Sequence, residues 1–150
     1  MTVADEIIVH PYGVGDVVAQ ATYELTRDSL VRYAGASGDF NDIHYRDDVA
    51  ERVGLPGVIA QGMLTMGISI QPVVDWLGDP AKVTDYQVRF TRPVVVPAEG
   101  AAIVEVVATI KEIDEAAGTA RVDLTTTFDS ATVLGKAQVR VVLPVGPSLS

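Results

Sequence analysis

The sequence contains no cysteine, and this absence excludes several kinds of chemistry at once. Disulfides, iron–sulfur clusters, thiolate zinc sites and a cysteine nucleophile all require that side chain. The chain also begins without a basic segment followed by an apolar one, which argues against a secretory signal. We therefore expect a cytoplasmic protein, with which the lack of cysteine is compatible.

Basic residues are also scarce. Lysine and arginine number 11 against 20 aspartates and glutamates, giving a net charge of −9. Binding to nucleic-acid phosphates requires a basic face, so no nucleic-acid partner is expected. With two histidines and no cysteine, we expect neither a metal site nor a resident cofactor. The longest apolar stretch, 58–77, is interrupted by polar residues and proline, and it predicts a buried helix instead of a membrane span.

Length and composition predict one compact domain. The chain has 150 residues, of which 48% are hydrophobic, and no internal linker or repeat is visible. We expect the domain to span 13–143, with 1–12 as a flexible lead-in and 144–150 as a tail.

The pattern predicts a strand, two short helices, a long helix and then four strands. In order these are a strand at 17–25, a helix capped by Thr26 and ending near Gly35, an irregular segment at 36–45, a short helix from Asp47 or Asp48 to Gly54, a helix at 62–77, and strands at 83–92, 101–112, 119–129 and 132–143. The long helix is apolar all round, so we expect it to be enclosed, with a kink or break at Pro72. This order indicates an α+β domain whose antiparallel sheet wraps a central helix.

The two histidines stand in different contexts. His10 lies in the lead-in, where a solvated surface side chain is expected. His44 follows Asp39 by five residues, a spacing that would place the two side chains roughly 140° apart on a helix. They can meet only if the intervening backbone is irregular, which Gly38 and Asn41 allow. The alternative is a turn in which Asp39 caps the next segment and His44 is merely exposed.

Two motifs make a family resemblance specific. The run Tyr-Ala-Gly-Ala-Ser-Gly-Asp-Phe-Asn-Asp-Ile-His at 33–44, followed by Ala50, resembles the hydratase-2 signature of the MaoC-like (R-specific enoyl-CoA hydratase) family. Gly-Met-Leu at 62–64 matches its second hallmark, and similarity covers most of 15–143. Within the family, the chain most resembles the catalytic beta subunit of mycobacterial (3R)-hydroxyacyl-acyl-carrier-protein dehydratases. The resemblance implies a single hotdog fold with a five- to six-stranded sheet around the long helix.

The resemblance also implies a hydro-lyase that reversibly hydrates trans-2-enoyl thioesters to (3R)-hydroxyacyl thioesters in fatty-acid-type metabolism. Asp39 and His44 would hold and activate the water and pass its proton to C2, and Asn41 would orient neighbouring groups. The Gly62 N–H would face the thioester oxygen, because a helix N-terminus offers unpaired donors and a positive dipole end.

Five further residues are candidates for substrate contact, although each also has a structural explanation. They are Ser37, Gln61, Met63, Arg89 and Arg92. The two arginines, joined by Arg46 and Lys82, could bind phosphates of the carrier, or they could be solvated strand charges. Met63 is expected to fill the core, and Ser37 to have a structural role.

The chain departs from the family pattern at three positions. Asp42 stands where the signature has proline, and a carboxylate there would raise the pKa of His44 if it pointed inward. Gln61 replaces the usual histidine before Gly62. A serine that supports the aspartate in some relatives aligns with Ile70, and the adjacent Ser69 is expected to face about 100° away.

Two other functions remain open at this stage. A hotdog thioesterase commonly carries a carboxylate on or near the central helix, and 60–74 contains none. A noncatalytic hotdog subunit would not need both Asp39 and His44. In each case we expect an acyl thioester carried by coenzyme A or acyl carrier protein. We also expect a second hotdog subunit, in a homodimer or heterodimer, because a lone sheet leaves an open edge.

Overall fold

The computed structural model describes residues 11–144, so His10 and most of the predicted lead-in and tail lie outside the described residues. Its elements are β1 (Val17–Leu25), α1 (Arg27–Ser37), the 3-10 turn η1 (Asp42–His44), α2 (Asp47–Arg52), α3 (Gly62–Leu77), the 3-10 turn η2 (Pro80–Lys82), β2 (Val83–Phe90), β3 (Ala102–Asp114), β4 (Thr119–Phe128), β5 (Ala131–Thr132) and β6 (Leu134–Val142). The strands form one antiparallel sheet in the order β1-β3-β4-β6-β2, and the short β5 pairs with β4. This is the predicted α+β architecture.

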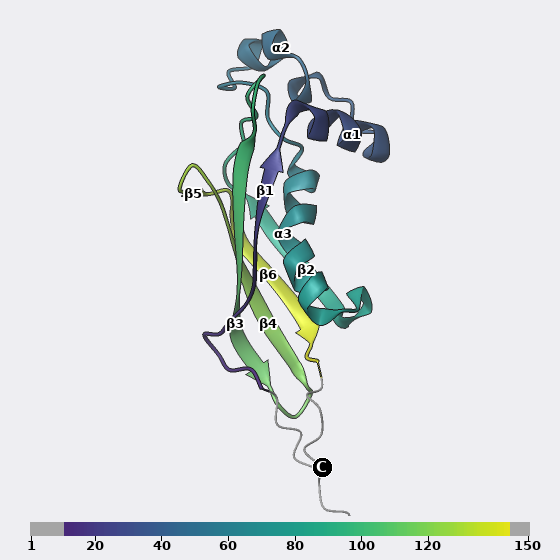
Figure 1. The fold of residues 1–150 in the computed structure, drawn as a ribbon, viewed down its shortest axis with the longest axis vertical. Helices are drawn as coiled ribbons and strands as arrows, with labels where there is room; N and C mark the ends of the chain where they lie inside the picture. The colour runs from purple at the N-terminus through teal and green to yellow at the C-terminus, as the bar shows by residue number, and fades with distance from the viewer. Residues whose placement is uncertain (1–10, 145–150) are drawn as a thin grey trace, which may run out of the picture.

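Helix α3 lies along one face of the curved sheet (Figure 1). Its first turns lie near α1 and α2, at the same end of the molecule. Along most of β4 and the first nine residues of β3, every second side chain is buried. This period of two is what a strand produces when only one of its faces packs on a core.

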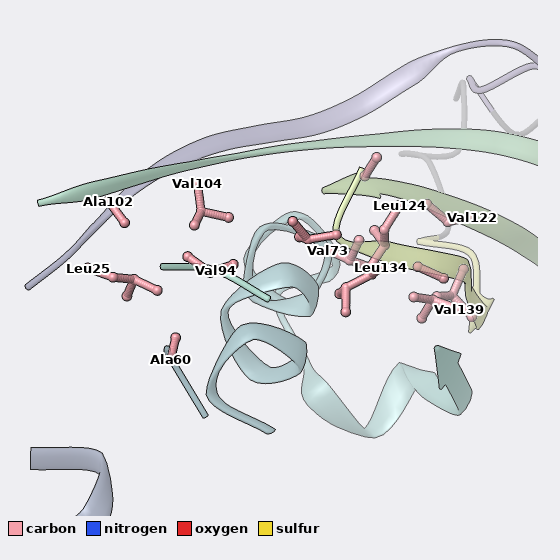
Figure 2. Packing of buried hydrophobic residues seen from close by; sticks show 14 of the residues in the cluster. Leu25, Ala60, Val73, Val94, Ala102, Val104, Val122, Leu124, Leu134 and Val139 are labelled. Atoms are coloured by element: carbon pink, nitrogen blue, oxygen red, sulfur yellow. The ribbon is translucent and has the colours of Figure 1, made fainter. Parts of the chain in front are cut away.

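The core fills the space between α3 and the sheet (Figure 2). Val73 of α3 is fully buried and belongs to one apolar cluster with Val104, Leu124 and Leu134 from three strands. Each such side chain contributes roughly 1.5–3 kcal/mol when it is removed from water. None of the helices in residues 11–144 combines the length and apolar character needed to cross a bilayer.

Helix α1 begins and ends with clear local signals. The Thr26 side chain accepts a hydrogen bond from the Ser29 N–H, and the Ser29 side chain accepts one from the Thr26 N–H, forming a reciprocal capping box. The helix runs to Ser37, slightly beyond the predicted end, and stops at Gly38, whose φ of 78° is left-handed. The chain therefore leaves the helix immediately before Asp39.

We expect Thr26→Ala to lower the free energy of unfolding by about 1 kcal/mol, because it removes the side-chain acceptor at the start of α1. Denaturant unfolding of the variant measures this loss. Thr26→Ser is the matched control, since it keeps the hydroxyl and should stay close to the parent protein. Equal stabilities of the alanine and serine variants would contradict the capping role.

Helix α3 corrects two expectations. It continues through Pro72 without a break, because packing against the sheet offsets the one hydrogen bond that proline removes. It is also buried along one stripe only, which includes Thr65, Ser69 and Val73, and it is not enclosed on all sides. Met63 lies on the opposite side and is 59% exposed, so its predicted role in filling the core is wrong.

Candidate functional site

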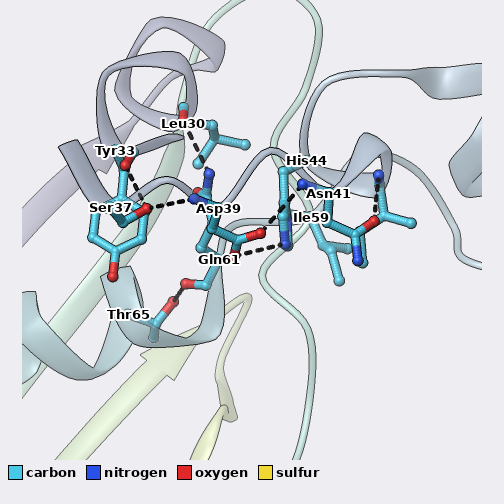
Figure 3. A network of polar contacts seen from close by, with 10 residues as sticks. Leu30, Tyr33, Ser37, Asp39, Asn41, His44, Ile59, Gln61 and Thr65 are labelled. Atoms are coloured by element: carbon cyan, nitrogen blue, oxygen red, sulfur yellow. Dashed lines mark hydrogen bonds and ion pairs between the residues drawn. The ribbon is translucent and has the colours of Figure 1, made fainter. Parts of the chain in front are cut away.

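The Asp39 and His44 side chains meet at the end of α1, although their spacing would separate them on a helix. The left-handed Gly38 and the turn η1 reverse the chain between them. His44 Nε2 lies 3.6 Å from Asp39 Oδ2 (Figure 3). The histidine is buried, whereas 44% of the Asp39 side chain is exposed. At this separation the two groups leave room to share a water molecule at hydrogen-bond distance from both.

The protonation pattern of the His44 ring follows from its surroundings. Nδ1 lies 2.7 Å from the Ile59 carbonyl oxygen, which can only accept a hydrogen bond. Nδ1 therefore carries the proton and donates a hydrogen bond to the Ile59 carbonyl oxygen. In the neutral ring this leaves Nε2, the nitrogen facing Asp39, free to accept a proton.

The loop that carries Asp39 is held by its own side chains. The Asp39 N–H donates to Ser37 Oγ at 3.1 Å, and Ser37 Oγ donates to the Tyr33 carbonyl at 2.7 Å (Figure 3). The Asn41 N–H donates to Asp39 Oδ1 at 3.2 Å, while Asn41 Oδ1 accepts from the Ile43 N–H and caps η1. The geometry thus places Ser37 and Asn41 as supports of the loop.

The carboxylate of Asp42 is engaged on the outer side of this loop. It accepts a hydrogen bond from the Tyr45 hydroxyl at 2.6 Å and lies 3.5 Å from Arg46. The bond to Asp42 raises the pKa of Tyr45 above its usual value. Arg46 also pairs with Asp48, so its guanidinium group is occupied by two neighbouring carboxylates. It therefore does not join the other predicted phosphate ligands. Asp42 thus binds Tyr45 and Arg46, and its carboxylate forms no hydrogen bond or ion pair with His44.

The start of α3 offers unpaired backbone donors. Its N-cap residue Gln61 makes no capping side-chain bond, and the first turn contains no acidic residue. A Cβ built on Gly62 would lie 3.1 Å from Phe90 Cε1, so the aromatic ring packs directly over the glycine. Glycine is therefore the residue that lets both the ring and a ligand approach this helix end closely.

A hollow of about 280 Å³ joins His44 to the start of α3. We call it the His44 hollow, and it is lined by His44, Ile59, Ala60, Gly62, Thr65, Phe90, Thr91, Arg92, Pro93, Val94 and Leu134. It is lined by His44, by the first residue of the uncapped helix α3 and by Arg92, and its walls are mostly apolar. Such a combination suits a largely apolar ligand with one polar reacting group.

Not all of the predicted ligand residues reach this hollow. Arg92 lines it, but Arg89 lines a separate hollow with Lys136. Met63 lines a third one, with Tyr23 and Tyr33. Phe90 also lines the hollow, although its role was not predicted. The alternation of Tyr86, Val88 and Phe90 along β2 is the sequence signal that places these side chains on one face of the strand.

Gln61 is fully buried beside this site. Its Nε2 donates to the Leu30 carbonyl of α1 at 3.0 Å, which ties α1 to the start of α3. Among the described residues, its Oε1 has no hydrogen-bond partner. Gln61 does not line the His44 hollow, so its predicted contact with substrate is replaced by a contact between helices.

Comparison with known proteins shows a family whose domain matches more than half of this chain. Residues 13–127 match the family described as the MaoC like domain. The 3-hydroxyacyl-thioester dehydratase X of Mycobacterium tuberculosis is 36% identical over 78 residues, covering 52% of this chain and 27% of that protein.

Solved structures have the same fold. A MaoC-like dehydratase superposes with a TM-score of 0.86 at 38% identity, covering 89% of this chain and 41% of that one. The (R)-hydratase from A. caviae involved in PHA biosynthesis superposes with a TM-score of 0.79 at 19% identity, over 91% of this chain and 100% of that one. The chain thus spans about a quarter of the curated relative and less than half of the first of these structures. The match to 13–127 and the shared hotdog fold show that this chain belongs to the MaoC-like family of dehydratase and hydratase domains.

Proposed function

We propose that the chain catalyses the reversible hydration of trans-2-enoyl thioesters and, in reverse, the dehydration of (3R)-hydroxyacyl thioesters. The observation that carries this proposal is that buried His44, which pairs with Asp39, lines one hollow together with Gly62 at the uncapped start of α3. Membership of the MaoC-like family supports the same reaction class. The names of two similar proteins, a 3-hydroxyacyl-thioester dehydratase and an (R)-hydratase, point to this substrate type and stereochemistry.

In the hydration direction, a water molecule is held between the Asp39 carboxylate and His44 Nε2, which lie 3.6 Å apart. These groups accept a proton as the water oxygen bonds to C3 of the substrate. The π electrons shift toward C2 and the thioester carbonyl, whose oxygen becomes negative. That oxygen is stabilised by the Gly62 N–H and by the positive end of α3. The proton is then delivered to C2, so one water is added and the enzyme returns to its starting state.

Every proton in this scheme is carried by water or by a protein side chain, and the scheme therefore requires no cofactor. The acyl group would arrive on coenzyme A or on acyl carrier protein. Arg92 would meet an anionic part of the carrier. Two observations support this role: Arg92 lines the hollow, and it forms none of the ion pairs within residues 11–144.

We also propose that this domain pairs with a second hotdog unit. Strand β2 bonds to β6 along one edge, and no strand within 11–144 pairs with its other edge. Phe40 and Phe90 stand beside the site and are each more than half exposed. An open edge and exposed aromatic rings near a reaction site are features that a partner subunit would cover.

The decisive experiment is a hydration assay with purified protein and trans-2-butenoyl-CoA, followed as loss of the conjugated enoyl absorbance. We expect turnover that gives the (3R)-hydroxy product, identified by chiral chromatography. Release of free coenzyme A without hydration would favour the thioesterase alternative, which the absence of a carboxylate from 60–74 disfavours. Hydration only in the presence of a coexpressed second hotdog chain would indicate a heterodimer. Activity that survives loss of Asp39 and His44 in such a complex would make this chain the noncatalytic subunit.

A further inference from the structure

We infer that the enzyme is built for short acyl chains, of up to roughly eight carbons, because the space beyond the His44 hollow is closed by a hydrogen bond between α3 and β4. This inference rests on the proposed function and adds to it the class of acyl group. This hydrogen bond joins the hydroxyls of Ser69 on α3 and Thr126 on β4. No sequence motif predicted that these two residues limit the length of the substrate.

Thr65 is the residue furthest along α3 that lines the hollow. It lies three residues beyond Gly62 on α3, is buried, and lines the hollow together with Leu134 of β6. An acyl chain whose thioester oxygen faces the Gly62 N–H would pass Thr65 as it enters the space between helix and sheet. Residues on the same helix face further along α3 therefore decide how far the chain can extend.

Ser69 is the next residue of that face, one turn beyond Thr65. Its hydroxyl donates to the Thr65 carbonyl at 2.6 Å and accepts from Thr126 Oγ1 of β4 at 3.0 Å. Ser69 and Thr126 are both completely buried. A methylene chain between helix and sheet would need contact distances of about 4 Å on each of its sides. A direct bond of 3.0 Å leaves no such gap at this level of the helix.

Buried apolar side chains stand next to the hydroxyl pair on α3 and β4. Val73 lies one turn beyond Ser69, Leu124 lies two residues before Thr126, and both belong with Leu134 to the buried core cluster (Figure 2). A longer acyl chain would have to displace apolar side chains and also break the hydroxyl pair. The Thr126 hydroxyl would then remain buried without its partner, which is costly in an apolar environment.

The distance along α3 from Gly62 to Ser69 sets the longest acyl chain that fits before the hydroxyl pair. Ser69 lies seven residues beyond Gly62, or about 10 Å along the axis at ~1.5 Å per residue. An extended chain advances ~1.2 Å per bond, since three backbone bonds span at most ~3.6 Å. Roughly eight carbons therefore reach from the thioester to the barrier, and dodecenoyl chains would exceed it.

The test compares kcat/KM of the full chain for trans-2-butenoyl-, hexenoyl-, octenoyl- and dodecenoyl-CoA. We expect dodecenoyl-CoA to be hydrated at least ~10-fold less efficiently than the best of the shorter substrates, the scale on which a pocket rejects excess methylene groups. Equal or better hydration of dodecenoyl-CoA would overturn the inference while leaving the proposed function intact. Failure to hydrate any of the four substrates would instead count against the proposed function.

Variants of the barrier provide the second measurement. Ser69→Ala combined with Thr126→Ala removes both hydroxyls and should raise the dodecenoyl-to-butenoyl ratio of kcat/KM several-fold. Thr126→Ser is the matched control, because it keeps a hydroxyl in place and should leave this ratio unchanged. An identical ratio in the double variant and the control would show that the hydroxyl pair is not the barrier. If the double variant fails to fold, the chain-length profile of the parent protein still decides the question.

Discussion

Asp39→Asn and His44→Gln should each lower kcat for enoyl-thioester hydration by about 10²- to 10⁴-fold, the range that a positioned acid or base contributes. Asparagine keeps the shape of Asp39 but cannot take up a proton or carry the negative charge that faces His44 Nε2. Glutamine at 44 keeps a polar amide but loses the ring nitrogen that accepts the proton. Steady-state kinetics with trans-2-butenoyl-CoA measures both losses.

The double variant should be little worse than either single variant, because two groups that hold one water act as a unit. Asp42→Asn is the matched control, since this neighbouring carboxylate binds Tyr45 and Arg46 and forms no hydrogen bond or ion pair with His44. Its kcat should stay within about twofold of the parent value, as expected for a surface change away from the reacting groups. Full turnover in both Asp39→Asn and His44→Gln would remove these residues from the mechanism.

Gly62→Pro should lower kcat by about 10²- to 10³-fold relative to Gly62→Ala, the cost of removing one donor from an oxyanion site. Gly62 is the first residue of α3, a position where proline fits a helix and loses only its own N–H. The residue before it, Gln61, already has φ −59° and ψ 132°, a conformation that proline tolerates in its neighbour. The substitution therefore deletes one hydrogen-bond donor with little disturbance of the backbone.

Alanine is the necessary comparison because both variants place a Cβ against the Phe90 ring. The crowding of Phe90 by this Cβ is common to the two proteins and cancels in their ratio. The loss should appear mainly in kcat, since the negative charge on the thioester oxygen develops in the transition state. Equal kcat values for Gly62→Pro and Gly62→Ala would show that this N–H does not stabilise the reacting oxygen.

Local sequence signals predicted most of the elements. The bounds of β1 and α3 agree with prediction at both ends, because each segment combines its hydrophobic period with clear boundary residues such as Thr26 and Gly78. The reciprocal cap at Thr26 and the left-handed Gly38 are likewise properties of a few adjacent residues. Pro72 was misjudged because the penalty of an interior proline is local, whereas the packing that offsets it comes from the sheet.

The sequence by itself determined the α+β order of elements, the irregular segment that carries Asp39 and His44, and the family to which that segment belongs. Only the tertiary structure decided how these residues can act. The Ile59 carbonyl that orients His44 lies 15 residues away in the chain, and the Thr126 hydroxyl that meets Ser69 lies 57 residues away. Such contacts depend on how the sheet curves around α3, and this curvature cannot be predicted from composition or periodicity. The periodicity of a sequence predicts which face of a helix or strand is buried, but not which atoms that face contacts.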